Sequence, residues 1–192
     1  HLRGSASLRY QGIEDLTWHP NGEIIVSVGW DDVIRVWDPK TEKLLKRLPA
    51  VGGSLSVYFS PSGSMMVTGH LGDQPIVLWD LETWTEMGTL DTDGVEVKCV
   101  QFSPDGRRLA ACGGQEADAE SPLDNDTGWV RVWEITDKEP AQWRMMEIAR
   151  RKSIFTDLTW TADGKRLATA SLDGHSRLWD VSSTQFDGIG RE

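Results

Sequence analysis

Short runs of alternating apolar and polar residues recur along the chain. The segments EIIVSV, SMMVTG, RRLAAC and KRLATA each alternate with a period of two, which predicts β-strands. Each run follows a turn signal, PNG, PSG, PDG or ADG. The glycine of such a turn can adopt the left-handed backbone conformation that a tight hairpin needs. The pattern therefore predicts four hairpins of one construction.

Four longer segments align on these hairpins and cover residues 15–38, 56–80, 99–134 and 157–180. Each closes on an apolar residue, a tryptophan and an acidic residue. The closing tryptophans are Trp37, Trp79, Trp133 and Trp179, spaced by 42, 54 and 46 residues. A repeat of about 40–45 residues is typical of a propeller blade. The third unit is the longest because it contains an acidic insertion, Gln115–Asp126.

Each unit is expected to contain four short strands. The first strand ends at Trp18, Phe59, Phe102 or Trp160, and the hairpin, the tryptophan segment and a more variable segment such as KLLKRL or AQWRMMEI follow. A sheet packed between two neighbouring sheets is apolar on both faces, so bulky flat side chains suit it. Six of the ten tryptophans, the four closing ones with Trp18 and Trp160, are therefore expected in the core.

These four units resemble the WD40 repeat family over nearly the whole chain. The resemblance rests on the FSPDG-like turns and on the apolar-Trp-Asp ending. It implies an all-β fold, a WD40-type β-propeller with four consecutive four-stranded antiparallel blades, as part of a larger propeller of about seven blades. The expected blades are about 13–50, 54–92, 95–150 with the insertion at 115–126, and 154–190. Residues 1–12 would be the outer strand of a preceding blade.

Four such blades are expected to form an open arc. An open arc exposes the apolar faces of its first and last blades, and repeat proteins need caps at such ends. We therefore expect the remainder of the propeller, or a second copy of the chain, to complete it.

The family also has a structural aspartate six residues before the closing tryptophan. Asp31, Asp73 and Asp173 occupy this position, and in the third unit Thr127 takes it, with Asp126 alongside. A carboxylate there can accept bonds from backbone N–H groups, which favours turn anchors over catalytic groups. The histidine that bonds this aspartate in the family is missing, so blade rigidity is expected to depend more on packing.

Composition narrows the function. A net charge of −10 argues against nucleic-acid binding, which would need a basic stripe. No apolar run approaches the roughly 18 residues of a membrane span, and no signal peptide is recognisable, so a cytoplasmic location is expected. Cys99 and Cys112 would lie opposite each other on adjacent strands; reduced thiols are favoured over a disulfide.

Catalytic motifs are absent from the sequence. It has no G-x-S-x-G, no H-E-x-x-H, no glycine-rich phosphate loop and no Cys/His pair,. We therefore expect no catalytic residue, no cofactor and no metal. The resemblance implies a protein-interaction scaffold. The alternatives are a propeller enzyme with an axial metal, and a purely structural half-propeller completed by another copy or chain.

The family's binding loops lie between blades and between the second and third strands, at the top face. Trp30, beside Asp31, is the principal candidate for contact with a protein or peptide,; packing on a neighbouring turn is its alternative. Asp15, Arg151 and Asp157 are expected on the same face. The run Arg150-Arg151-Lys152 is expected to open the loop into the fourth unit. The acidic insertion is interpreted as a solvated loop rather than a calcium site.

Overall fold

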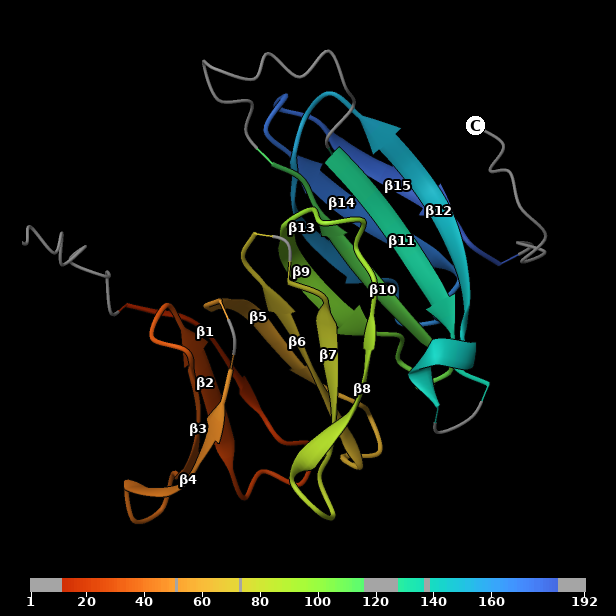
Figure 1. The fold of residues 1–192 in the computed structure, drawn as a ribbon. Coiled ribbons are helices and arrows are strands. Elements are labelled where there is room, and N and C mark those ends of the chain that lie inside the picture. Colours follow the sequence, from red (N-terminus) through yellow and green to blue (C-terminus); the bar gives the residue numbers. More distant parts are fainter. Residues whose placement is uncertain (1–11, 51, 73, 116–127, 137–138, 183–192) are drawn as a thin grey trace, which may run out of the picture.

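The computed structural model describes residues 12–50, 52–72, 74–115, 128–136 and 139–182. They form four separate antiparallel sheets in chain order, here called blades 1 to 4 (Figure 1). Blade 1 consists of β1 (Ile13–Trp18), β2 (Ile25–Gly29), β3 (Val33–Asp38) and β4 (Lys43–Pro49). Blade 2 consists of β5 (Ser54–Phe59), β6 (Met65–His70), β7 (Ile76–Asp80) and β8 (Thr85–Leu90).

Blades 3 and 4 follow the same plan. Blade 3 consists of β9 (Val97–Phe102), β10 (Arg108–Gly113), β11 (Gly128–Glu134) and β12 (Arg144–Arg151), with the short 3-10 helix η1 (Pro140–Gln142) before β12. Blade 4 has the three described strands β13 (Phe155–Trp160), β14 (Arg166–Ser171) and β15 (Ser176–Asp180). The described residues do not include the expected fourth strand of blade 4. They also exclude residues 1–11 and most of the insertion, residues 116–126. The prediction of an all-β chain of antiparallel sheets is confirmed.

The four sheets lie side by side as an arc (Figure 1). The first strands, β1, β5, β9 and β13, contact one another along its inner side, and the fourth strands, β4, β8 and β12, point away. Neighbouring blades belong to different sheets, so no backbone ladder joins them. Instead, a polar side chain of one first strand accepts a bond from a backbone N–H of the next. These bonds run from Val57 to Asp15 (2.9 Å), from Val100 to Ser56 (3.2 Å) and from Trp160 to Gln101 (3.1 Å).

The apolar core lies between the blades. Three buried clusters fill the three junctions, and each takes residues from both neighbouring sheets. Blade 1 presents Val26 and Ile34 to Phe59 and Met66 of blade 2, for example. Because blades 2 and 3 are covered on both sides, their strands are apolar on both faces, as a sandwiched sheet requires.

The tryptophans correct one expectation. Trp79, Trp133 and Trp160 are buried, but Trp37 and Trp179 are only half-buried. Trp18 is 53% exposed, so its assignment to the core is wrong. The reason is positional: Trp18 lies on the face of blade 1 that would meet a preceding blade, and no described residue covers that face.

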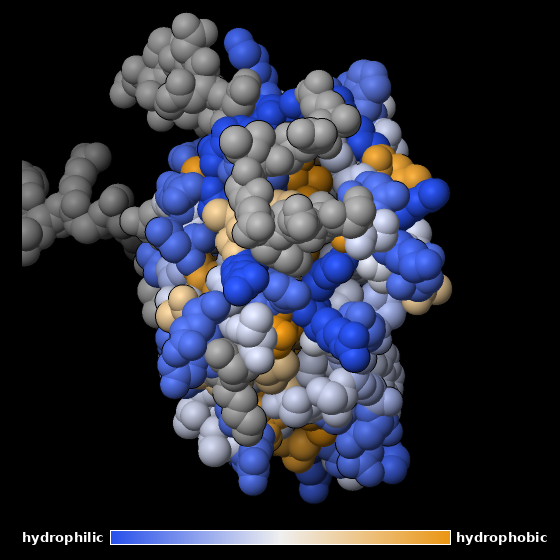
Figure 2. Space-filling model, turned by 90° about the vertical axis from the view of Figure 1, so that its right-hand side faces the viewer, coloured by the Kyte–Doolittle hydropathy of each residue, from blue (hydrophilic) through white to orange (hydrophobic). Residues whose placement is uncertain are grey.

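The outer side of the arc is mainly polar. Figure 2 views it from the side of β12, and hydrophilic residues dominate there, with apolar residues in small separate patches. Met145 on β12 is one of the few large apolar side chains exposed on an outer strand. Isolated apolar residues of this kind are normal on a protein surface.

Leu78 and Leu178 occupy the same position of the repeat, directly before the closing tryptophan, and test the inter-blade core. Leu78 is fully buried between blades 2 and 3, whereas Leu178 is 57% exposed on the face of blade 4 that points away from blade 3. We expect Leu78→Ala to lower the free energy of unfolding by about 2–5 kcal/mol, and Leu178→Ala by less than about 1 kcal/mol. Urea denaturation followed by circular dichroism measures both. Equal losses would contradict the described packing.

Candidate interaction surface

Every blade has two ends, and the candidate site lies at one of them. The turns that follow the second strands, and the loops that lead into the next blade, form what is here called the top end. Trp30 lies in the turn between β2 and β3, and Asp93 lies in the loop between β8 and β9. The hairpin turns after the first strands lie at the opposite, bottom end.

Trp30 is partly exposed at the top end. Its side chain is 37% exposed, and its indole Nε1 donates a hydrogen bond to the carboxylate of Glu14 on β1. Its backbone N–H donates to the carbonyl of Gly12 (3.3 Å). The ring is therefore held in place while keeping part of its surface open, which suits an aromatic contact residue.

The turn aspartates have arginine partners that sequence reasoning missed. Asp31 accepts a two-point ion pair from the guanidinium of Arg35, four residues later. Asp173 does the same with Arg177 at 3.2 and 2.6 Å, and also accepts the backbone N–H of His175 (3.0 Å). The Arg35 guanidinium holds the pKa of Asp31 below its usual value. The available signal was the repeated arginine two residues before the closing tryptophan.

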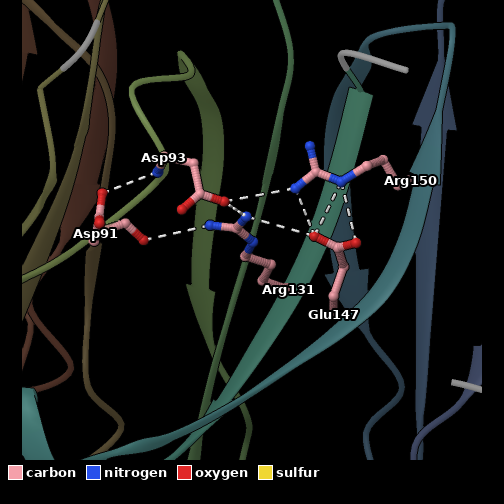
Figure 3. Close-up of polar contacts among 5 residues, drawn as sticks. All are labelled: Asp91, Asp93, Arg131, Glu147 and Arg150. Atoms are coloured by element: carbon pink, nitrogen blue, oxygen red, sulfur yellow. Dashed lines mark hydrogen bonds and ion pairs between the residues drawn. The ribbon is translucent and has the colours of Figure 1, made fainter. Parts of the chain in front are cut away.

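Asp73 and Asp126, the other two expected anchors, lie outside the described residues. In blade 3 the equivalent arginine, Arg131, has no aspartate four residues before it in the sequence. Its guanidinium instead contacts the carboxylate of Asp93 and lies 3.4 Å from Glu147 (Figure 3). The Arg131 side chain is only 2% exposed. A buried cation thus joins β11 to β12 and to the loop from blade 2.

Arg150 completes this charged cluster. Its Nη2 lies 2.7 Å from Glu147 and 3.6 Å from Asp93 (Figure 3). The hydrogen bond from Arg150 is the main reason why the pKa of Glu147 lies below its usual value. Arg150 and Arg151 were expected in a loop, but they are the last two residues of β12, paired with β11.

Asp15 and Asp157 occupy matching positions on the inner side of the arc. Each first strand has a β-bulge, and Asp15, Ser56, Cys99 and Asp157 directly follow it. Burial raises the pKa of Asp15, and the charge of Asp157 adds to this effect. These two predicted residues therefore occupy the same position of the repeat, in blades 1 and 4. The indole of Trp30 is hydrogen-bonded to Glu14 on β1, whereas Arg151 lies on the fourth strand of blade 3, β12.

The two cysteines are free thiols on directly opposed positions of β9 and β10. Burial raises the pKa of Cys99 to about 12, and it raises the pKa of Cys112 well above its usual value. The Cys99 thiol donates to the Leu158 carbonyl (3.9 Å). A thiol with such a pKa carries almost no thiolate at neutral pH and is a poor nucleophile.

Blade 2 contains a buried chain of polar side chains, which the sequence did not predict and which adds to the packing on which blade rigidity was expected to depend more. Trp79 Nε1 donates to the Thr68 hydroxyl (3.1 Å), which lies 2.8 Å from His70 Nε2. His70 Nδ1 is 3.3 Å from the hydroxyl of Ser54. This chain ties β5, β6 and β7 together at a position where sequence reasoning saw only a histidine near a turn.

The part of the chain that the structure describes holds no group of three or more His, Cys, Asp and Glu side chains that could bind a metal ion. Nor does it contain a helix long and apolar enough to cross a membrane.

The charged cluster predicts a pH dependence. Because the folded-state pKa of Glu147 is lowered, its ionised form stabilises the fold above about pH 4.5, and this contribution is lost as the pH falls below that value,. We expect Glu147→Gln to cost about 0.5–1 kcal/mol at pH 7, and the difference from wild type to shrink as the pH falls below about 4.5. Denaturation between pH 3 and 7 measures this. Glu86→Gln, at an exposed position of β8, is the control. A difference that stays the same size from pH 7 to pH 3 would contradict the assignment.

The thiols give a second prediction. In the folded protein at pH 8, we expect neither Cys99 nor Cys112 to react within minutes with a disulfide reagent such as dithionitrobenzoate, because roughly one thiol in ten thousand would be ionised at a pKa of about 12,. In guanidinium chloride both should react at once. Rapid reaction of one thiol in the native protein would show that its burial is wrong.

Comparison with known proteins agrees with this architecture. A model of the WD domain, G-beta repeat family matches residues 5–38, 84–134 and 149–180. The "Small ribosomal subunit protein RACK1y" of Oryza sativa subsp. japonica is 31% identical over 168 residues, which cover 85% of this chain and 46% of that relative. The "Small ribosomal subunit protein RACK1" of Caenorhabditis elegans is 28% identical over 166 residues, 83% of this chain and 46% of that relative.

The chain thus spans about half the length of the curated relatives it matches. The stretch between the first two family matches contains β4, β5, β6 and β7, and these strands nevertheless belong to sheets of the same kind as the matched segments. The family model covers more than half of the residues, and the same antiparallel unit recurs throughout the described chain. The chain therefore belongs to the WD domain, G-beta repeat (WD40) family.

Proposed function

We propose that this chain is a non-catalytic scaffold that binds a protein or peptide through its top end. The observation that carries the proposal is Trp30, an aromatic side chain held by Glu14 yet 37% exposed. An anchored, partly exposed aromatic residue loses little conformational entropy on binding and contributes a large contact area. Glu147 and Arg150, the partly exposed members of the charged cluster, lie at the same end and would add polar contacts.

The relatives support a binding role in a larger assembly. Both are named small ribosomal subunit proteins, and that association is theirs. For this chain we propose protein partners, a cytoplasmic location, and no intrinsic catalysis, cofactor or metal. The acidic net charge of −10 favours protein over nucleic-acid partners.

A second part of the proposal concerns completeness. Leu16 and Trp18 are more than half exposed on the face of blade 1 that points away from blade 2. Leu178 is more than half exposed on the face of blade 4 that points away from blade 3. Blades in the middle of the arc bury the equivalent positions, Val57, Phe59 and Leu78. Further WD40 blades, from the remainder of a ring of about seven or from a second copy, would cover these faces.

The binding proposal predicts position-specific contact. With a photo-crosslinking amino acid at position 30, we expect one or a few discrete protein adducts in cells, and none with the same group at Leu45, exposed on the outer strand β4. Trp30→Ala should then weaken binding of the purified adduct partner at least tenfold, since a central aromatic contributes about 2 kcal/mol or more. Leu45→Ala should leave the affinity unchanged.

Unchanged affinity of a correctly folded Trp30→Ala protein would contradict the proposed role of Trp30. Adducts of equal yield at positions 30 and 45 would contradict the proposal that partners bind at the top end.

A further inference from the structure

A groove lies at the bottom end, between blades 1 and 2. The hairpin turn after β1 and the turn between β7 and β8 border it, and it encloses about 390 Å³. This volume lies within the range of sites that take a small ligand or a single side chain. Apolar side chains from both blades line it, and they are Ile24, Met65, Leu81, Trp84 and Met87.

The polar lining of this groove contains three acidic residues besides His19, Asn21 and Ser64. Glu23, Asp80 and Glu82 take part, and none of the lining residues is a lysine or an arginine. The ring of Trp84 already attracts a cation, since the ammonium of Lys46 lies 5.6 Å from its centroid. An apolar floor with carboxylates around it suits a side chain that has a long apolar stem and a positive head.

The chain itself supplies a template for the occupant. At the matching junction between blades 3 and 4, Arg108 extends from the start of β10, and its Nη1 donates a 2.7 Å hydrogen bond to the carbonyl of Val181. Arg108 is the second residue after its turn glycine, and Val181 is the second residue after its closing tryptophan. In the repeat, these positions correspond to Ile24 and Leu81 at the junction between blades 1 and 2.

Blade 1 therefore has an isoleucine where blade 3 has the arginine that bridges two blades. Ile24 is shorter and carries no donor, and the open groove lies at this position. We propose that the groove between blades 1 and 2 binds an arginine side chain of a protein partner. The stem would pack against Trp84 and Met87, and the guanidinium would face the carboxylates of Asp80 and Glu82.

This site is independent of the top end. It lies at the opposite ends of the strands from Trp30 and uses none of the residues invoked for top-end binding. A chain with both sites would hold one partner at each end of blades 1 and 2. Guanidinium suits the site better than ammonium because it is planar, stacks on aromatic rings and donates to carbonyl and carboxylate oxygens together.

The probe is N-acetyl-arginine N-methylamide, titrated into the full chain and followed by the NMR signal of the Trp84 indole N–H, which a Trp84→Phe variant assigns. We expect saturable shifts in the millimolar range. The citrulline analogue has nearly the same shape without the charge, and it should bind at least tenfold more weakly. Equal binding of the citrulline or the lysine analogue would overturn the proposal.

Variants locate the site. Ile24→Arg reproduces the arrangement of Arg108 and should fill the groove, so the affinity for the probe should fall at least tenfold. Leu45→Arg adds the same charge on the exposed strand β4 and should leave the affinity unchanged. Glu82→Gln should weaken the probe several-fold, with Glu86→Gln as its control. A folded Ile24→Arg protein that binds normally would overturn the proposal. If that variant does not fold, an unchanged affinity in Glu82→Gln would overturn it.

Discussion

The packing of this chain depends on one constraint: each sheet is apolar on both faces and must be covered on both sides. Among the described residues no single blade has a core of its own, because the three buried clusters lie between sheets. Hydrophobic burial is roughly proportional to the area removed from water, so stability comes from adding neighbours. The same constraint explains the ends of the arc, where Leu16, Trp18 and Leu178 occupy positions that are buried in the middle blades.

Polar side chains fix the geometry that burial alone leaves undetermined. Apolar contact is non-directional, whereas the bonds from the Val57 N–H to Asp15 and from the Val100 N–H to Ser56 set how far one first strand lies from the next. The arginines two residues before the closing tryptophans also fix geometry, one within a blade and one between blades. Arg35 closes its own turn through Asp31, while Arg131 reaches the loop from the preceding blade.

Repetition makes these differences informative. Matching positions share backbone geometry, so a change of residue at one of them isolates what its side chain does. Arg108 bridges blades 3 and 4, and Ile24 at the same position leaves a groove between blades 1 and 2. The acidic groove alone would not indicate which ligand it binds. The matching junction between blades 3 and 4 holds an arginine, and this comparison suggests the ligand.

The sequence by itself determined the repeat, the strands and their turns, because strand periodicity, turn glycines and the Trp-Asp ending are local signals that each unit repeats. It also led to the family, and it singled out Trp30. The tertiary structure alone decided which of these side chains are covered and with which they pair. Trp18 has the same local pattern as Trp160, yet within the described residues only Trp160 is covered by a preceding blade. Arg131 pairs with Asp93, 38 residues away, since the position four residues before it holds Thr127 and not an aspartate. Burial and long-range pairing depend on which blade lies next to which, and no local pattern encodes that.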